Sequence, residues 1–376
     1  MSSNFGHDLT VSVFGASHGQ AIGAVIDGLP CGEAIDLEAL TAFMKRRAPG
    51  QSIIATQRKE ADTPVFMAGL VNGKLSGSPL AFYIENTNQR SGDYNNLRDV
   101  PRPSHADYTA RVRYGDYVDL RGGGHFSGRL TAPLCCAGGI AIQLLAAKGI
   151  QAGSHLRQIG HVKDASIDYV NPDMKALHKA GHETLAMVDN HARLSAITYI
   201  DELRQTGNST GGIVELFATG LPVGIGNPNF DGIENRLAKA IFGIPGVKGV
   251  SFGSGFDGCV QTGAEQNDPF RIDNGTIHTT SNNSGGIQGG ITNGMPLVLQ
   301  VGLKPTASIS LHQDSISFSE EHNVDLQIKG RHDPCIAVRA VPVVEAVAAL
   351  VLLDFLLPQY KYLPNAVCSN EKESSL

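Results

Sequence analysis

Two long apolar segments constrain the fold of this 376-residue chain more than any other feature. The first, TAPLCCAGGIAIQLLAAKG (131–149), has helical spacing and is apolar on every side. The second, VPVVEAVAALVLLDFLLP (341–358), is interrupted only by Glu345 and Asp354. A helix that is apolar all round is buried in a core or spans a membrane, and neither segment offers the roughly 20 uninterrupted apolar residues of a spanning helix. We therefore expect two buried helices, the second beginning near Pro342.

The two segments also resemble each other in what precedes them. A polar, basic loop containing Gly-Arg leads into each one, at Arg129 and again at Arg331. This faint repetition suggests an internal duplication. The sequence has no short-period repeat and no linker-like stretch, and 41% of its residues are hydrophobic, enough for a sizeable core. We expect a single α+β domain over residues 1–365, with residues 366–376 as a disordered tail.

Other elements follow from local patterns. Periodicity and turn residues predict further helices within 36–50 and 230–246. Alternation bounded by glycine and proline predicts strands within 9–19, 21–32, 211–226, 247–253 and 295–305. Residues 51–113 show no clear periodicity and are rich in polar residues, so we interpret this segment as irregular.

Charge and cysteine usage narrow the functional classes. The net charge of −6 argues against nucleic acid or an anionic membrane as the main partner. The first ten residues, MSSNFGHDLT, lack the basic and apolar regions of a signal peptide. The six cysteines are scattered without CxxC or zinc spacing, which favours reduced thiols, no metal site and a cytoplasmic location.

The stretch RGGGHFSGRL (121–130) is the strongest local indication of a binding site. Three glycines let the backbone approach a ligand closely, and they run directly into His125, Ser127 and Arg129. The buried helix that follows would direct unpaired N–H groups at an anion. This pattern indicates a pocket for a planar or phosphorylated ligand.

Further groups capable of chemistry are spread along the chain. Ser17 and His18 follow a strand within GASHGQ, although a histidine satisfied by hydrogen bonds in a turn is an equal alternative. Arginine forks bind phosphate and carboxylate, but a run of basic residues is more often a solvated face. No P-loop or dinucleotide fingerprint occurs. The remaining candidates are Lys45, Arg46, Arg47, Arg58, Lys59, Arg90, Arg102, His105, Arg111, Arg113, Lys304, Thr306, Ser308, Arg331, His332 and Asp333.

Taken together, these motifs resemble the chorismate synthase family. The segments GASHG, PGQS, TQRKEAD, NTNQRS, HADY, RGGG, NSGGI, KPT and GRHDPC follow the order and spacing of that family from the first strand to the last helix. The resemblance implies a β-α-β sandwich with internal pseudo-symmetry, assembled as a homotetramer. It also implies an anti 1,4-elimination of phosphate from 5-enolpyruvylshikimate 3-phosphate that yields chorismate and requires reduced FMN (FMNH2).

The resemblance assigns roles to individual residues. His18 would protonate the departing phosphate, His105 would protonate or polarise the reduced flavin, and Ser17 and Asp333 would help relay the proton. The substrate-binding positions would be Arg46, Arg47, Arg129 and Arg331. The flavin-contacting positions would be His125, Phe126, Ser127, Gly285, Lys304, Pro305, Thr306, Ala307, Ser308 and Arg331.

The chain departs from the family at several positions near the expected flavin edge. The family commonly has Glu at Ala16, Arg at His125, Ser at Phe126 and Glu at Leu130. Two other functions are alternatives, a flavin enzyme of another reaction class and a silent scaffold. The first lacks a nicotinamide fingerprint, and the second does not account for the presence of His18, His105 and Asp333. NADPH on the protein itself and an external flavin reductase both stay open as the source of reduced flavin.

Overall fold

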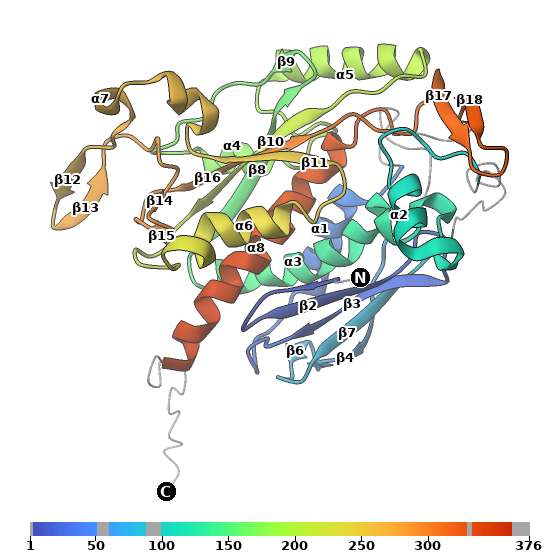
Figure 1. The fold of residues 1–376 in the computed structure, drawn as a ribbon. Helices are drawn as coiled ribbons and strands as arrows, with labels where there is room; N and C mark the ends of the chain where they lie inside the picture. The colour runs from blue at the N-terminus through green and yellow to red at the C-terminus, as the bar shows by residue number, and fades with distance from the viewer. Residues whose placement is uncertain (1–2, 51–59, 88–98, 329–332, 363–376) are drawn as a thin grey trace, which may run out of the picture.

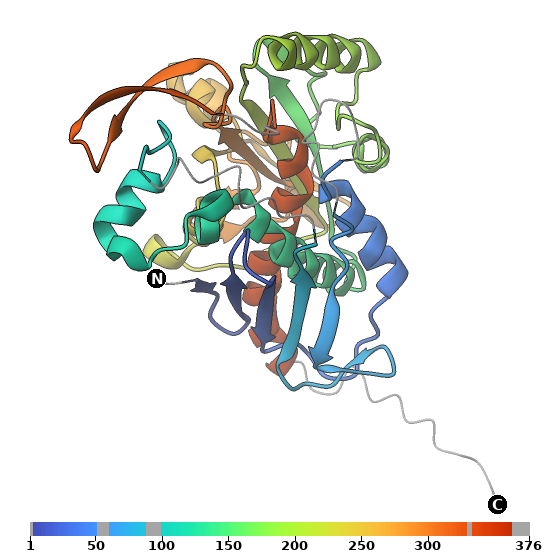
Figure 2. The same ribbon diagram turned by 90° about the vertical axis from the view of Figure 1, so that its right-hand side faces the viewer.

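Two long helices form the middle layer of the molecule. The computed structural model describes residues 3–50, 60–87, 99–328 and 333–362. In it, α3 (Thr131–Ala146) and α8 (Ala337–Tyr362) pack against each other and contact strands of two five-stranded antiparallel sheets. Figures 1 and 2 show the helices between these sheets. The architecture is the expected β-α-β sandwich.

The two sheets have the same strand order once their edge additions are set aside. The first runs β1-β2-β3-β7-β4, with β1 (Asn4–Phe5), β2 (Thr10–Gly15), β3 (Ala21–Asp27), β4 (Val65–Ala68) and β7 (Leu80–Glu85). The second runs β11-β16-β10-β8-β9, with β8 (Gln151–Ile159), β9 (Val162–Lys163), β10 (Gly212–Thr219), β11 (Val247–Phe252) and β16 (Leu297–Leu303).

The order of elements along the chain confirms the internal pseudo-symmetry. The first half runs β2, β3, α1 (Leu37–Arg47), β4, β7 and α3, and the second runs β8, β10, α6 (Ile233–Ile241), β11, β16 and α8. The sheet order β2-β3-β7-β4 therefore matches β8-β10-β16-β11. A register irregularity interrupts the outermost pair in both sheets, β4 with β7 and β11 with β16.

Small residues on α3 explain how the helices pack so closely. A Cβ added to Gly138 would lie 2.3 Å from Ala346 Cβ on α8, and one added to Gly139 would lie 2.6 Å from Leu40 Cδ1 on α1. Two adjacent glycines thus face two different helices. The apolar character of α3 follows from this burial on several sides.

The two acidic residues within α8 tie distant segments to the core. Asp354 accepts hydrogen bonds from the backbone N–H groups of His7, Asp8 and Leu9, at 3.0, 2.8 and 2.7 Å, and pairs with Arg236. Glu345 lies in the same helix and pairs with Arg46 of α1. Contrary to the expectation from the sequence, the helical segments Gly128–Ala146, which contains α3, and Ala337–Pro358 of α8 are long and apolar enough to cross a membrane, but 83% and 100% of their most apolar windows are buried in the protein.

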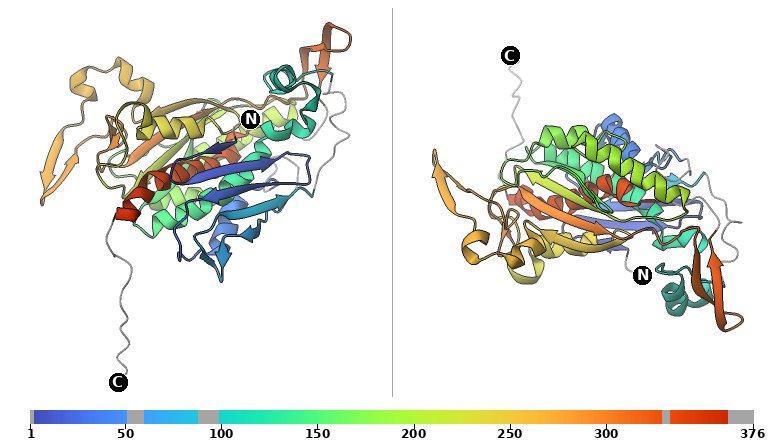
Figure 3. Two further views of the ribbon diagram at one scale, coloured as in Figure 1. Left: turned by 60° about the horizontal axis from the view of Figure 1, so that its bottom comes forward. Right: turned by 90° about the horizontal axis from the view of Figure 1, so that it is seen from above.

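The remaining elements surround this sandwich. Leu177 of α4 packs with Phe217 and Val298 of the second sheet. Two hairpins project from opposite ends of the molecule, β12–β13 and β17–β18 (Figure 3). Their bounds and those of the other elements are β5 (Leu70–Val71), β6 (Lys74–Leu75), α2 (Asp107–Tyr114), α4 (Met174–Ala180), α5 (Asn190–Gln205), α7 (Gly263–Gln266), β12 (Phe270–Asp273), β13 (Thr276–Thr279), β14 (Ile287–Gln288), β15 (Ile291–Thr292), β17 (His312–Ser317) and β18 (His322–Gln327).

Two expectations about local structure were wrong. The last helix begins at Ala337, and Pro342 lies inside it rather than at its start. Residues 51–113 are not irregular throughout, because they contain β4 to β7 and the beginning of α2. The single domain over residues 1–365 stays a prediction, and residues 366–376 lie outside the described part of the chain.

Candidate active site

A cavity of about 620 Å³ opens where the loops after β2, before α3, after β16 and before α8 meet. This is within the size range of small-molecule pockets, roughly 300–1,000 Å³. It gathers most of the predicted site residues: Ser17, His18, Arg47, His105, His125, Phe126, Ser127, Arg129, Lys304, Pro305, Thr306, Ala307, Ser308 and Asp333.

The glycine triplet before α3 lies beside this cavity, and Gly122 lines it. Gly122, Gly123 and Gly124 all have positive φ, at 58°, 85° and 54°. A Cβ on Gly122 would lie 2.0 Å from His18 Nδ1, and one on Gly123 would lie 3.2 Å from His105 Nε2. Consecutive glycines therefore bring the backbone against both predicted catalytic histidines, and a side chain at Gly122 would displace His18.

The turn carrying Ser17 and His18 is fixed by backbone hydrogen bonds. Ser17 N donates to Gly124 O at 3.0 Å, and Asn86 Nδ2 donates to the carbonyls of Ala16 and Gly19 at 3.0 and 2.9 Å. His18 is only 6% exposed although it lines the cavity. A buried imidazole on a fixed turn suits proton transfer to a ligand held in the cavity.

His105 is oriented by a carboxylate. Its Nδ1 lies 2.6 Å from Asp107 Oδ1, which favours the proton on Nδ1 and leaves Nε2 as the nitrogen available to a ligand. Arg102 holds Asp107 in turn, through Nε and Nη2 at 2.7 Å each. Burial would raise the pKa of Asp107, but hydrogen bonds from Arg102 and His105 outweigh it and hold that pKa well below its usual value.

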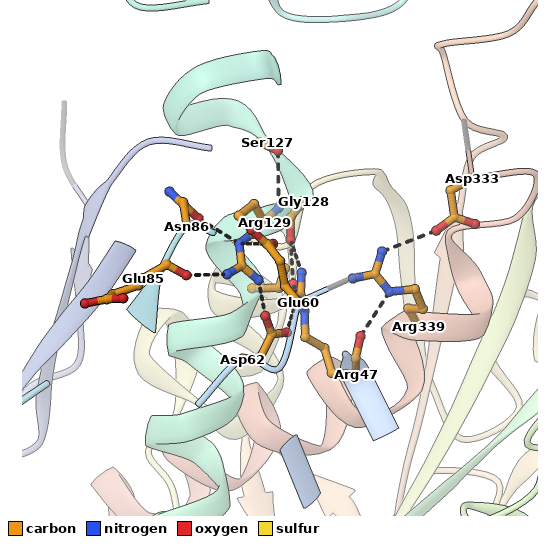
Figure 4. Close-up of polar contacts among 11 residues, drawn as sticks. Arg47, Glu60, Asp62, Glu85, Asn86, Ser127, Gly128, Arg129, Asp333 and Arg339 are labelled. Atoms are coloured by element: carbon orange, nitrogen blue, oxygen red, sulfur yellow. Dashed lines mark hydrogen bonds and ion pairs between the residues drawn. The ribbon is translucent and has the colours of Figure 1, made fainter. Parts of the chain in front are cut away.

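A buried ionic cluster forms one wall of the cavity. Arg47 and Arg129 both pair with Asp62, and Arg129 Nε also lies 3.1 Å from Glu60 Oε2 (Figure 4). Burial would raise the pKa of Asp62, but the two guanidiniums hold it below its usual value. Burial lowers the pKa of Arg129. An arginine nevertheless stays charged, so the wall keeps its positive groups.

Asp333 and Arg339 lie at the other side of this cluster. Arg339 Nη1 donates to Asp333 Oδ2 at 3.4 Å, and its Nε donates to Arg47 O at 3.0 Å (Figure 4). Burial raises the pKa of Asp333. Burial, with a contribution from the nearby Arg47 charge, lowers the pKa of Arg339 to about 10.

The segment after β16 supplies hydroxyl groups and a cation to the cavity. The Thr306 Oγ1 atom is buried and has no hydrogen-bond partner within the described parts of the chain. The Lys304 ammonium donates to Ser104 O, and burial, with a smaller effect of Lys248, lowers its pKa. A buried hydroxyl without a protein partner is the kind of group that a bound ligand satisfies.

His125 makes two hydrogen bonds at the cavity edge. Its Nδ1 lies 2.7 Å from Gly15 O and its Nε2 2.7 Å from Ser3 Oγ. A carbonyl only accepts, so Nδ1 carries the proton, and Nε2 can accept from the Ser3 hydroxyl. Both ring nitrogens therefore have a hydrogen-bond partner when the imidazole carries one proton.

Two predicted site residues that the structure describes, Arg46 and Gly285, do not line the cavity. Arg46 turns away from it and binds Glu345 through both Nη atoms, at 2.6 and 2.9 Å. Gly285 packs against the end of β11, where an added Cβ would lie 2.4 Å from Gly253 N. Arg331 lies outside the described residues, as do Arg58, Lys59, Arg90 and His332. The geometry therefore gives no support to substrate binding by Arg46 or to flavin contact by Gly285 within one chain.

Sequence reasoning missed several residues that build the site. Arg339 and Asp62 complete the buried ionic cluster, and Asp107 orients His105. The available signal for Arg339 was its charge in a helix that is otherwise almost wholly apolar. Asp62 and Asp107 carried no comparable signal, because their partners are set by tertiary contacts.

Comparisons with known proteins agree with one another. The family model described as chorismate synthase matches residues 9–357. The chain is 41% identical over 367 residues to chorismate synthase of Lancefieldella parvula, covering 95% of this chain and 96% of that one. It is 42% identical over 360 residues to that of Cytophaga hutchinsonii, covering 95% and 98%. A crystal structure of chorismate synthase superposes with a TM-score of 0.75 at 28% identity, covering 94% of this chain and 93% of the other.

Proposed function

The chain belongs to the chorismate synthase family, and on that premise we propose that its cavity binds 5-enolpyruvylshikimate 3-phosphate and reduced FMN together. As a family member it is a carbon–oxygen lyase that acts on a phosphate ester and forms chorismate, at the end of the shikimate pathway. The observation that carries the assignment to this cavity is the glycine triplet that contacts His18 on one side and His105 on the other.

The charge of the cavity suits the substrate. 5-Enolpyruvylshikimate 3-phosphate carries a phosphate and two carboxylates, while the chain has a net charge of −6. Arg47, Arg129, Arg339 and Lys304 line the cavity, so the chain concentrates positive charge at this place. Guanidinium groups recognise phosphate and carboxylate through paired hydrogen bonds.

His18 is proposed as the acid that protonates the departing phosphate. Its ring is buried at the end of β2, beside the backbone of Gly122. As the C–O bond to the phosphate breaks, a proton from this imidazole neutralises the developing charge on the leaving oxygen. A positioned acid of this type contributes about 10²–10⁴-fold to a rate.

Ser17 and Asp333 are proposed to relay the remaining proton, and His105 is proposed to protonate or polarise the reduced flavin. His105 presents Nε2, because Asp107 holds Nδ1 at 2.6 Å. Asp333 is a suitable proton holder, since burial raises the pKa of its carboxyl. The C6 proton leaves as the new double bond forms, and Ser17 and Asp333 would pass it towards solvent.

The residues present fit a flavin. A family member uses reduced flavin. The groups that would hold FMN are the segment Lys304–Ser308, which includes a buried Thr306 hydroxyl with no partner among the described residues, and the edge formed by His125, Phe126 and Ser127. Reduced FMN, when bound, supplies electron density to a reaction that has no net redox change. The substitutions His125 and Phe126 lie at this edge, where the family commonly has Arg and Ser.

The proposal also covers the oligomeric state of the protein and its location in the cell. By analogy with the family, the chain forms a homotetramer in the cytoplasm, without nucleic acid or membrane partners. Its flavin is reduced either with NADPH on the protein or by an external flavin reductase. Arg331 and Gly285 stay predicted ligand contacts, and a neighbouring subunit is one way in which Gly285 could approach a flavin.

An anaerobic assay tests the proposed function. The protein is incubated with 5-enolpyruvylshikimate 3-phosphate and dithionite-reduced FMN, and chorismate is measured by its absorbance. Chorismate is expected only when reductant, FMN and substrate are all present. Failure to form it with reduced FMN would contradict the proposal.

A further inference from the structure

The cavity contains an arginine whose contacts differ from those of its two neighbours. Arg339 lies in the first turns of α8, and its side chain is 21% exposed, against 3% for both Arg47 and Arg129. Arg47 and Arg129 are tied to Asp62. Arg339 contacts its carboxylate partner only at 3.4 Å, longer than the usual N–H···O range of about 2.7–3.2 Å.

The hydrogen bonds of Arg339 leave part of its guanidinium available. Nε donates to Arg47 O and Nη1 to Asp333, while Nη2 has no hydrogen-bond partner among the residues the structure describes. Arg339 is thus held firmly through Nε and more loosely through Nη1, beside a cavity that it lines. A planar fork held in this way is suited to a bidentate anion.

The ion pairs in this part of the cavity also indicate that Arg339 can bind an anion. Three guanidiniums, Arg47, Arg129 and Arg339, face three carboxyls, Asp62, Glu60 and Asp333. The first two carboxyls are held by short contacts within the wall. Asp333 is the one whose bond to a guanidinium is long, so it is the carboxylate that an incoming anion can most easily replace.

We propose that Arg339 is a further substrate-binding residue, which turns from Asp333 to an anionic group of the bound substrate, and that the released Asp333 then accepts a proton from solvent. This inference rests on the proposed function, because it takes the substrate to be the polyanion named above. One ion pair is exchanged for another, and one proton moves from water to Asp333, so that the charge in the buried region stays balanced.

The surroundings of Asp333 favour this protonation. Burial already raises its pKa, and the Arg339 and Arg47 charges, with the backbone N–H of Cys335, oppose that effect. Loss of Arg339 as a partner removes the largest of these opposing contributions. The other titratable or charged groups that line the cavity are His18, Arg102, His105, His125, Arg129, Lys248 and Lys304.

Isothermal titration calorimetry provides the test. 5-Enolpyruvylshikimate 3-phosphate is titrated into protein loaded with oxidised FMN, without reductant, in two buffers of different ionisation enthalpy, so that both affinity and proton uptake are measured. Arg339→Gln should raise the Kd about ten- to hundredfold, the worth of a hydrogen bond between charged groups. Arg339→Lys should show a smaller loss. Arg204→Gln, which removes a surface arginine paired with Asp201, should bind like the wild type.

Asp333→Asn gives an independent measurement. It should bind the substrate at least as tightly as the wild type, because Arg339 no longer has a competing carboxylate, and its proton uptake should be lower by up to one proton. Proton uptake by the substrate phosphate contributes in both proteins, so the comparison subtracts that background and reports on Asp333. Wild-type affinity in both Arg339 variants, or unchanged proton uptake in Asp333→Asn, would overturn the inference.

The wild-type protein separates this inference from the proposed function. If the wild type binds the substrate and forms chorismate but the Arg339 variants bind equally well, only the role of Arg339 is wrong. If the wild type neither binds the substrate nor forms chorismate with reduced FMN, the proposed function itself is wrong.

Discussion

Replacing Gly122 by alanine tests the geometry of the site without removing any functional group. Gly122 has φ 58° and ψ 20°, a left-handed conformation that costs an L-residue roughly 1–2 kcal/mol. The added Cβ would also lie 2.0 Å from His18 Nδ1 and 3.0 Å from Ser17 Oγ. The methyl group therefore meets one proposed catalytic side chain directly and crowds another.

The expected loss of activity follows from that clash. Ordinary van der Waals contact of a Cβ begins at 3.4 Å, so either the loop or the His18 ring must shift by more than about 1 Å. A misplacement of about 1 Å in a catalytic group can cost on the order of 10²-fold in rate. We expect Gly122→Ala to lower kcat about 10²-fold, with a loss of unfolding free energy of about 1–2 kcal/mol from the backbone.

Gly149→Ala is the matched control for this experiment. Gly149 has φ +80° and nothing within 4 Å of its added Cβ, so the substitution carries the left-handed cost without a clash. Both variants should lose similar stability in urea unfolding, while only Gly122→Ala loses turnover in the anaerobic chorismate assay. Wild-type turnover in a folded Gly122→Ala protein would refute the contact between the glycine loop and His18.

Two further substitutions test the ionic groups. Asp107→Asn should lower kcat about 10²-fold or more, since His105 loses the carboxylate that fixes its tautomer. The folded state depresses the pKa of Asp107, so this group should stabilise the wild type above about pH 4, and that stabilisation should be lost as the pH falls through the acid range. Urea unfolding at pH 7 and at acid pH measures this loss. The unfolding free energy of Asp107→Asn should change less between the two pH values than that of the wild type. Arg46→Gln should lower the unfolding free energy by about 3–5 kcal/mol, because it leaves the buried Glu345 charge without its arginine and with only the hydrogen bonds from Ser154, while the KM of the folded enzyme stays unchanged. A large increase in KM without loss of stability would restore Arg46 as a substrate-binding residue.

Much of the fold could be predicted because the strongest patterns were also the most buried elements. The apolar segments at 131–149 and 341–358 became α3 and α8, and the repeated Gly-Arg loops marked equivalent positions in two halves of the same topology. Pro342 was misleading, because proline is common at the first helical position but here lies five residues after Ala337. The strand β7 was overlooked within a polar segment, although its residues alternate between buried and partly buried.

The site could be predicted as a set of residues but not as a set of contacts. Arg46 and Arg47 are adjacent in α1, and successive residues of a helix point in different directions. Arg47 therefore reaches Asp62 and the cavity, whereas Arg46 reaches Glu345 of α8. Which of the two faces the ligand depends on where α8 lies, and this is a tertiary contact that spacing along the chain does not contain.

The proposed chemistry requires two imidazoles, His18 and His105, that act in one cavity. His18→Ala and His105→Ala are therefore compared with His191→Ala, which removes an exposed histidine of α5, in the anaerobic assay with reduced FMN. Each of the first two should lower turnover about 10²–10⁴-fold while keeping the melting temperature near that of the wild type, and His191→Ala should be unaffected. Wild-type turnover in both His18→Ala and His105→Ala would contradict the proposed roles of these histidines.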